Sequence, residues 1–168
     1  MIITTQVIGL IATLLVGLTY IKNSRERMLW IQFSASIIFA VHYLLLGAVT
    51  GALLSLLVAV RCIVYLKCQK NYIAVTFMIV FGICGIVTWQ NCYSILPTFG
   101  SVLFSLAFFV HSPKNVRFLS ILPSFLWGAY GILTGSWGGI ATEIICLCSI
   151  GYGYFKYDHK KNRDFSVI

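Results

Sequence analysis

The stretch Tyr72–Trp89, YIAVTFMIVFGICGIVTW, is an uncharged apolar run in the middle of the chain, and it decides how the rest can be arranged. On each side of it lie three further apolar segments, and the two sets resemble each other. A single helix between two three-helix units returns the chain to its starting side of a membrane, so the second unit inserts in the same direction as the first. We therefore predict an all-α integral membrane protein with seven spans, built as two parallel three-helix bundles joined by an inverting linker helix.

The composition indicates that lipid is the solvent for most of the chain. Of the 168 residues, 60% are hydrophobic and only 10% are charged, whereas a soluble domain carries about 25% charged residues. The net charge of +8 does not indicate a nucleic-acid partner, because the basic residues are confined to short links and the C-terminal tail. The expected partner is the lipid bilayer.

Seven apolar segments come close to the length of about 20 residues that crosses a hydrocarbon core of about 30 Å. They are Thr4–Ile21, Met28–Leu46, Thr50–Leu66, Tyr72–Trp89, Ile95–His111, Phe118–Thr134 and Trp137–Phe155. The links between them are too short for a soluble domain. The predicted units are a first bundle at 1–68, a linker helix at 69–92, a second bundle at 93–156 and a cytoplasmic tail at 157–168.

The basic residues fall in alternate links, which sets the orientation. They are Lys22, Arg25, Arg27, Lys67, Lys70, Lys114, Arg117, Lys156, Lys160, Lys161 and Arg163. With seven spans all of them lie on one face, whereas a six-span arrangement without Tyr72–Trp89 puts basic links on both faces. Because cytoplasmic loops carry the excess of Lys and Arg, the prediction is an outer N-terminus and a cytoplasmic C-terminus.

The two halves align with one another. Gly9 matches Gly100, Tyr43 matches Tyr130, and Arg27 roughly matches Arg117. Each half has a basic link after its first helix and a tight glycine-containing link between its second and third helices. Equal spacing and equal orientation indicate a parallel repeat, a transporter design that places the substrate near the midplane between the halves.

Several motifs carry a resemblance to a known family. They are ILPTFGSVLFSLAFF at Ile95–Phe109, LW at Leu126–Trp127, GSWGGIATE at Gly135–Glu143, HYLLLG at His42–Gly47 and AVR at Ala59–Arg61. With these motifs the chain resembles the YgjV family of bacterial inner-membrane proteins. Its seven-helix plan resembles the wider group of SWEET sugar transporters and their PQ-loop and PnuC relatives.

The resemblance implies transport by alternating access, and two departures bear on it. SWEET-type proteins carry a Pro-Gln pair and use prolines as hinges in the first two helices of each half. This chain has no Pro-Gln pair, its first helix has no proline, and Pro123 in the sixth helix aligns with about Ser36 in the second. Glycine and serine also allow a helix to bend.

Two charged residues lie well inside apolar runs, Arg61 in the third helix and Glu143 in the seventh. Insertion scales place an arginine at the bilayer centre at about +2.5 to 3.5 kcal/mol, so each residue needs a partner or water. On the repeat alignment the two differ by about five residues, roughly 7.5 Å of helical rise. They are predicted to form a polar binding or gating pair in a central cavity, with a structural ion pair as the alternative.

Other candidates have a structural alternative as well. His42 is a candidate gate or proton-coupling residue or a hydrogen-bonded interface histidine, and Trp127 either stacks on a solute ring or packs against protein or lipid. Gln32, Ser36 and Thr142 either line a pore or allow close helix packing. Pro123 completes the candidate set as a hinge.

No nucleophile elbow, HExxH motif, Walker loop or Cys/His metal spacing occurs, so we expect no enzyme activity, no cofactor and no metal. The expected function is a transporter or facilitator of a small polar solute of sugar or nucleoside size. The alternative is a non-transporting receptor or interaction protein on the same scaffold. Proton coupling and self-association into a homo-oligomer are left open by the sequence.

Overall fold

The computed structural model describes residues 2–158, with side chains from residue 4, and all of the regular elements in this range are helical. They are α1 (Ile2–Thr19), α2 (Arg25–Leu45), α3 (Val49–Lys67), α4 (Asn71–Val87), a 3-10 turn (Cys92–Ser94), α5 (Ile95–Phe109), α6 (Pro113–Leu119), α7 (Ile121–Leu133), α8 (Trp137–Gly153) and a π-helical turn (Tyr154–Asp158). The predicted all-α class is confirmed. The predicted tail overlaps this range only at its first two residues, and its remainder lies outside the described residues.

The sixth predicted helix, Phe118–Thr134, differs from the structure. It begins earlier, with Pro113 in the first turn of α6, where a proline is well tolerated. At Ser120 it breaks into α6 and α7, which meet at a bend of 42°. Pro123 explains the break, because it has no N–H to donate to the carbonyl of Leu119.

Four described helical segments are long and apolar enough to cross a membrane, and the bent pair makes a fifth if it counts as one span. The four are Arg25–Leu45, Val49–Lys67, Cys92–Phe109 and Trp137–Asp158. Thr4–Thr19 and Asn71–Val87 are apolar but shorter. The chain is therefore a multi-pass helical protein, and the count of seven spans stays a prediction.

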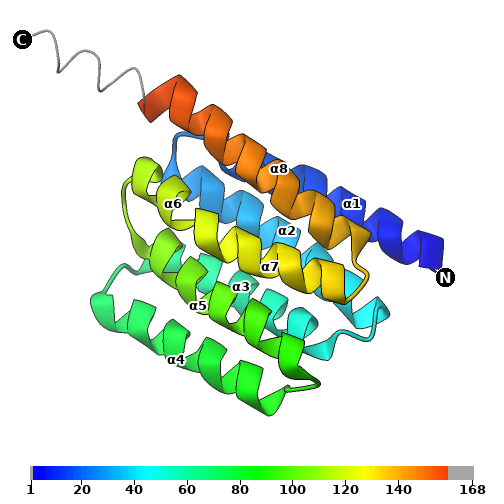
Figure 1. Cartoon of the computed structure of the whole chain (residues 1–168). Coiled ribbons are helices and arrows are strands. Elements are labelled where there is room, and N and C mark those ends of the chain that lie inside the picture. The colour runs from blue at the N-terminus through cyan, green and yellow to red at the C-terminus, as the bar shows by residue number, and fades with distance from the viewer. Residues whose placement is uncertain (1, 159–168) are drawn as a thin grey trace, which may run out of the picture.

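The helices pack as a ring with a two-fold order of contacts, which means that the helix contacts of one half repeat in the other half (Figure 1). In the first half α1 contacts α2 and α2 contacts α3, and in the second half α5 contacts α7 and α7 contacts α8. The ring is closed by α3 against α5 and by α8 against α1, so each contact has a counterpart in the other half. Helix α4 lies outside the ring against α5 and α3.

The links between the second and third helices of the halves share a backbone feature. Gly47 has a φ of 72° and Gly135 a φ of 67°, and they are the residues with positive φ in the described range. A side chain is disfavoured in this left-handed conformation. The glycine-containing links predicted for both halves thus turn the chain in the same way.

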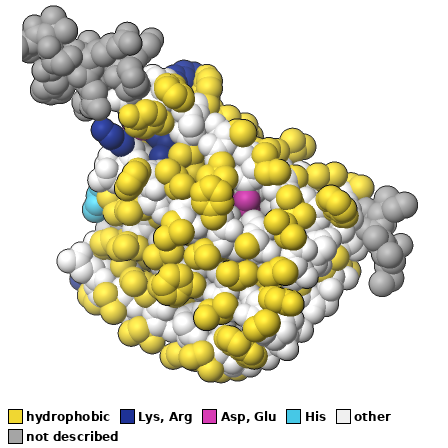
Figure 2. All heavy atoms as spheres, in the orientation of Figure 1, with side chains coloured by type: hydrophobic (Ala, Val, Ile, Leu, Met, Phe, Trp, Pro, Cys, Tyr) yellow, Lys and Arg dark blue, Asp and Glu magenta, His cyan; other side chains and the backbone are white. Residues whose placement is uncertain are grey.

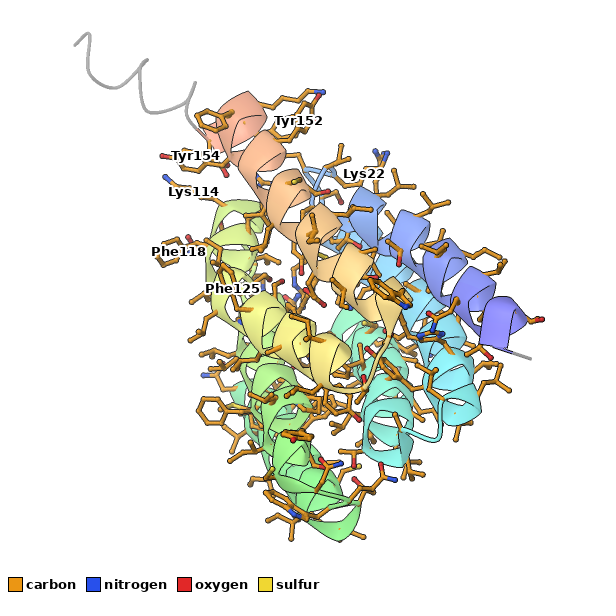
Figure 3. The ribbon with its side chains drawn as sticks, turned by 45° about the vertical axis from the view of Figure 1, so that its right-hand side comes forward. Lys22, Lys114, Phe118, Phe125, Tyr152 and Tyr154 are labelled. Carbon is orange, nitrogen blue, oxygen red and sulfur yellow. The ribbon has the colours of Figure 1, made fainter. Side chains whose placement is uncertain are left out.

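Consecutive helices run in opposite directions when the bent pair α6 and α7 is taken as one, and this gathers the basic links at one end of the bundle (Figure 1). Figure 3 shows Lys22 and Lys114 at the end where α8 finishes, close to the labelled Tyr152 and Tyr154. Elsewhere the surface is apolar: Figure 2 shows hydrophobic side chains over most of one face, with Lys and Arg at one end. Phe118 and Phe125 point outward and are 74% and 59% exposed, as expected for a surface that contacts lipid.

Candidate functional site

A cavity of about 60 Å³ lies between the helices of the ring. It is lined by Val16, Tyr20, Gln32, Ser36, Phe39, Tyr43, Ser55, Val58, Arg61, Phe104, Trp127, Gly139, Thr142, Glu143 and Cys146. Helices α1, α2, α3, α5, α7 and α8 all contribute, so both halves form the wall. The space suits a few water molecules, whereas pockets for drug-sized ligands have about 300 Å³ or more.

The structure brings six of the eight predicted site residues together in this wall: Gln32, Ser36, Arg61, Trp127, Thr142 and Glu143. His42 and Pro123 are not among the lining residues. Two of the six have hydroxyl groups that are already hydrogen bonded within the protein. Ser36 donates to the Gln32 carbonyl at 2.7 Å, and the Thr142 hydroxyl lies 2.7 Å from both the Gly138 carbonyl and the Thr13 hydroxyl.

Arg61 is fully buried, and none of its three guanidinium nitrogens has a hydrogen-bond partner among the described residues. Three aromatic rings surround its guanidinium carbon: Phe108 at 5.3 Å, Tyr65 at 5.8 Å and Phe81 at 5.9 Å. Cation–π contacts of this kind stabilise the charge, but they leave the N–H donors without acceptors. The aromatic cage therefore holds a cation that faces the cavity with its hydrogen-bonding capacity unused.

Glu143 lies across the cavity wall on α8, and its Oε2 atom is buried without a hydrogen-bond partner in the described part of the chain. Its side-chain stem packs over Gly128 of α7, where an added β-carbon would lie 3.3 Å from the Glu143 Cβ. No ion pair within 4.0 Å joins it to Arg61, since the salt bridge found among residues 2–158 involves other residues. The two predicted charges thus share one cavity without contacting each other directly.

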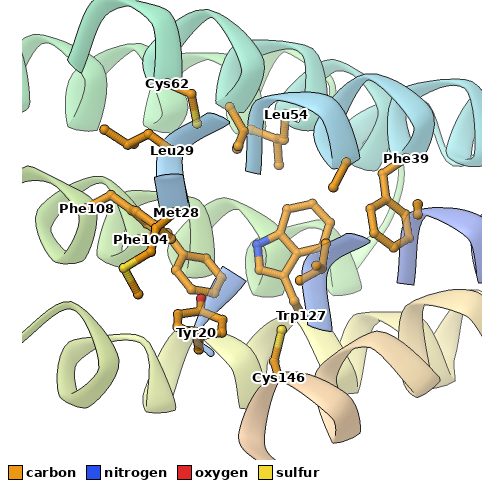
Figure 4. Close-up of a cluster of buried hydrophobic side chains, with 14 of the residues drawn as sticks. Tyr20, Met28, Leu29, Phe39, Leu54, Cys62, Phe104, Phe108, Trp127 and Cys146 are labelled. Atoms are coloured by element: carbon orange, nitrogen blue, oxygen red, sulfur yellow. The ribbon is translucent and has the colours of Figure 1, made fainter. Parts of the chain in front are cut away.

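Aromatic side chains form a layer at the end of the cavity away from the basic links. Tyr43 lies 5.8 Å from Trp127 and 6.0 Å from Tyr130 between ring centroids, and Trp127 lies 6.0 Å from Tyr130. Trp127 is 9% exposed, so the lipid-facing alternative for this residue is wrong. Figure 4 shows its indole ring in the core, with its nitrogen on the side of Tyr20. Tyr43 and Tyr130, aligned in the repeat, meet in this layer.

His42 is a fully buried hydrogen-bonding link between three helices. Its Nδ1 lies 2.8 Å from the Thr5 carbonyl of α1, and its Nε2 lies 2.8 Å from the Ser136 hydroxyl at the start of α8. A carbonyl only accepts, so Nδ1 donates, and in the neutral ring Nε2 accepts from Ser136. Ser136 in turn accepts from the Gly139 N–H at 2.9 Å, which caps α8. This geometry matches the interface alternative for His42.

A pair of arginine clamps closes the basic end of the ring, and the sequence reasoning missed both. Arg25, at the start of α2, donates to the Phe108 carbonyl at 3.1 Å and to the Tyr65 carbonyl at 3.3 Å. These carbonyls lie in the last turns of α5 and α3. Positive charge at the C-terminal end of a helix is stabilising because the helix dipole is negative there.

Arg117, in α6, makes the corresponding clamp in the other half. It is 1% exposed and donates to Asp158 through Nε at 3.0 Å and through Nη2 at 2.9 Å, and its Nη1 also reaches the Lys22 carbonyl at 3.3 Å. It thus joins the end of α1 to the end of α8. The counterpart of Arg117 by contacts is Arg25, whereas the sequence alignment pairs it with Arg27.

The cavity wall presents polar groups whose hydrogen-bonding capacity is unused within the described residues. No group of three or more metal-ligating His, Cys, Asp or Glu side chains occurs within the described residues. The cavity offers the guanidinium of Arg61 without described partners, the unpaired Oε2 atom of Glu143, an unpaired buried amide oxygen on Gln32, and the ring of Trp127. Buried polar groups in a native protein are ordinarily hydrogen bonded, so these groups await a ligand or water.

Comparison with curated proteins and with solved structures found no match. One family does match, over residues 3–161: Imp-YgjV, described as bacterial inner membrane protein. The match covers both halves, the linker helix and every residue of the cavity wall. The chain therefore belongs to the YgjV family of bacterial inner membrane proteins.

Proposed function

We propose that this protein transports a small polar solute across the bacterial inner membrane by alternating access between its two halves. The observation that carries the proposal is the placement of two ionisable residues in one cavity inside an apolar bundle: Arg61, with no hydrogen-bond partner among the described residues, and Glu143, with an unpaired Oε2 atom. Ionisable groups inside membrane segments are expensive and mark substrate or ion pathways by default. The role of the site in this proposal is binding and gating, without catalysis.

The proposal includes seven spans, with α6 and α7 as one bent span and α4 as the inverting helix. It is supported by the two-fold order of contacts in the ring, because rocking of one half against the other needs two equivalent halves. An outer N-terminus and a cytoplasmic C-terminus are part of the proposal, and the basic residues at one end of the bundle support them because cytoplasmic links carry the excess of Lys and Arg. Fusion of a fluorescent protein to each end tests this orientation: fluorescence is expected from the C-terminal fusion alone.

The arrangement corresponds to a closed state of such a transporter. The cavity, at about 60 Å³, is too small for a sugar-sized solute. The arginine clamps lie beyond it at the basic end, and the layer of Tyr43, Trp127 and Tyr130 lies at the other end. Opening toward the cytoplasm then requires the clamps to separate, and opening outward requires the aromatic layer to part. The bend at Ser120 and Pro123 gives the sixth span a place to flex.

Solute flux in proteoliposomes tests the function. Purified protein is reconstituted, and uptake of radiolabelled sugars, nucleosides, amino acids and vitamins is compared with that of empty liposomes and of an Arg61→Met/Glu143→Gln double variant. Saturable uptake by the wild type that the double variant lacks supports transport. A solute that binds tightly but never crosses favours the receptor alternative. Absence of both binding and flux from a folded sample overturns the proposal.

A further inference from the structure

The chemistry of the cavity narrows the class of solute, an inference that rests on the proposed function. Arg61 has five N–H donors on a group that is fully buried and has no hydrogen-bond partner in the described chain. Glu143 contributes a buried, unpaired carboxylate oxygen. Both line the same cavity, and they do not pair with each other. A ligand that completes this site must satisfy a cation and an anion together.

The packing of the helices keeps the side chains of Arg61 and Glu143 apart. The guanidinium of Arg61 lies within the cage of Tyr65, Phe81 and Phe108, which come from α3, α4 and α5. The stem of Glu143 lies on the opposite side of the ring, on α8 over Gly128 of α7. Arg61 itself belongs to α3 in the first half and Glu143 to α8 in the second, and both side chains line the cavity with the ring of Trp127.

Three classes of solute can be compared by whether each gives Arg61 and Glu143 a partner of opposite charge. A neutral sugar offers hydroxyl groups to both residues but neutralises neither charge. A solute with one charge pairs with one residue and leaves the other buried without a counter-ion, which is strongly unfavourable. A zwitterion pairs its carboxylate with Arg61 and its amine with Glu143. The loaded site then holds two ion pairs and no net charge, which suits passage through a low-dielectric region.

We infer that the transported solute is a small zwitterion of the amino-acid or betaine type. Its carboxylate is bound by Arg61, where a planar guanidinium can form two parallel hydrogen bonds. Its cationic nitrogen is bound by Glu143, and its apolar part lies against Trp127. Because Arg61 lies on α3 and Glu143 on α8, a bound zwitterion bridges the two halves.

The test measures thermal unfolding of the purified full-length protein in detergent, followed by tryptophan fluorescence. The probes are the twenty common amino acids and glycine betaine, with a matched set that shares one ring: L-phenylalanine, phenethylamine (amine only) and 3-phenylpropionate (carboxylate only). Glucose and uridine represent the sugar and nucleoside classes. A ligand at 100 times its dissociation constant stabilises the folded state by about 2.7 kcal/mol, which is readily detected.

Three variants separate a binding role from a structural one. Glu143→Gln is expected to weaken binding of the zwitterion at least tenfold and to shift preference toward the carboxylate-only analogue. Arg61→Gln is expected to shift preference the opposite way, toward the amine-only analogue. Glu26→Gln removes an exposed carboxylate near the start of α2, outside the cavity, and should bind as the wild type does. A general loss of stability does not shift the ligand preference of the two variants in opposite directions, so these shifts indicate a binding role.

The outcomes distinguish the inference from the function it rests on. Stabilisation by a sugar or nucleoside and by no zwitterion overturns the zwitterion class but leaves transport standing. Stabilisation by a zwitterion without flux in proteoliposomes supports the binding site and overturns transport. Stabilisation that is equal in the wild type and in Glu143→Gln removes Glu143 from the site. A well-folded sample that no probe stabilises overturns the zwitterion class.

Discussion

Two buried arginines in this molecule have opposite surroundings. Arg117 is 1% exposed and Arg61 is 0% exposed, so each has lost its water. Arg117 has a bidentate ion pair with Asp158 and reaches backbone carbonyls at the end of α1. Arg61 has aromatic faces and no hydrogen-bond acceptor among the described residues. The first joins helix ends, and the second has N–H donors that no described residue uses, which is why we propose it as a binding residue.

The largest effect is expected from breaking the Arg117 clamp. Arg117→Gln leaves Asp158 buried beside a neutral side chain, and removal of one partner of a buried ion pair destabilises by about 3 to 5 kcal/mol. Chemical unfolding in mixed micelles measures the loss. Arg117→Gln combined with Asp158→Asn should recover part of it, because no unpaired charge remains. A loss below about 1 kcal/mol would show that this ion pair contributes no more to the free energy of unfolding than an exposed ion pair does.

A smaller loss is expected at His42. His42→Leu removes the donor to the Thr5 carbonyl and the acceptor for Ser136, and a buried group deprived of its partner costs about 1 to 3 kcal/mol. The same unfolding assay measures it, with Ser136→Ala as the companion that removes a helix cap worth about 1 kcal/mol. If His42→Leu abolishes flux while leaving stability unchanged, the gating alternative replaces the structural one.

Arg25→Gln is expected to cost about 1 kcal/mol. Arg25 is only partly buried, its acceptors are two neutral carbonyls, and a typical hydrogen bond contributes about 0.5 to 1.5 kcal/mol net. Arg27→Gln is the matched control, since Arg27 is exposed two positions along the same helix. Equal losses in the two variants would show that Arg25 is no clamp.

The smallest change in stability, with the opposite sign, is expected at Arg61. Arg61→Met keeps an elongated side chain in the aromatic cage and removes a buried charge that has no acceptor among the described residues, so the free energy of unfolding is expected to stay the same or to rise slightly. Unfolding should therefore be unchanged or shifted upward while solute binding is lost. A loss of stability comparable to that of Arg117→Gln would show that both arginines stabilise the fold, and Arg61 would then have a structural role.

The helices could be predicted from the sequence because lipid leaves the backbone no other open-ended solution. Every apolar run except Tyr72–Trp89 also ends at a basic or glycine-containing link. The break at Ser120 was missed because Pro123 was taken as a bend inside one helix. The first and fourth spans stay predictions, because the helices Thr4–Thr19 and Asn71–Val87 are shorter than the segments that are long enough to cross a membrane. Helix α4, for example, has 17 residues.

The candidate site was predicted in part. Arg61 and Glu143 were found because a charge in an apolar run is conspicuous, and the repeat placed them in equivalent helices. Their failure to pair depends on how Phe81 of α4 packs against α3, which no local pattern specifies. The hydrogen-bonding roles of Arg25 and Arg117 were missed because membrane orientation alone is enough to explain basic residues in these links. The acidic Asp158 beside basic links was the available signal.

The two-fold order of helix contacts gives every position in one half an equivalent in the other. Counted from Gly51 and Gly138, the position equivalent to Arg61 holds Cys148, and the one equivalent to Glu143 holds Leu56. A dimer of identical three-helix chains would set arginine against arginine or glutamate against glutamate across its axis. With α4 outside the ring, both halves belong to one gene product and each can diverge alone. A single chain that carries both halves can thus place an arginine in one half and a glutamate in the other, so that the cavity has a basic side and an acidic side.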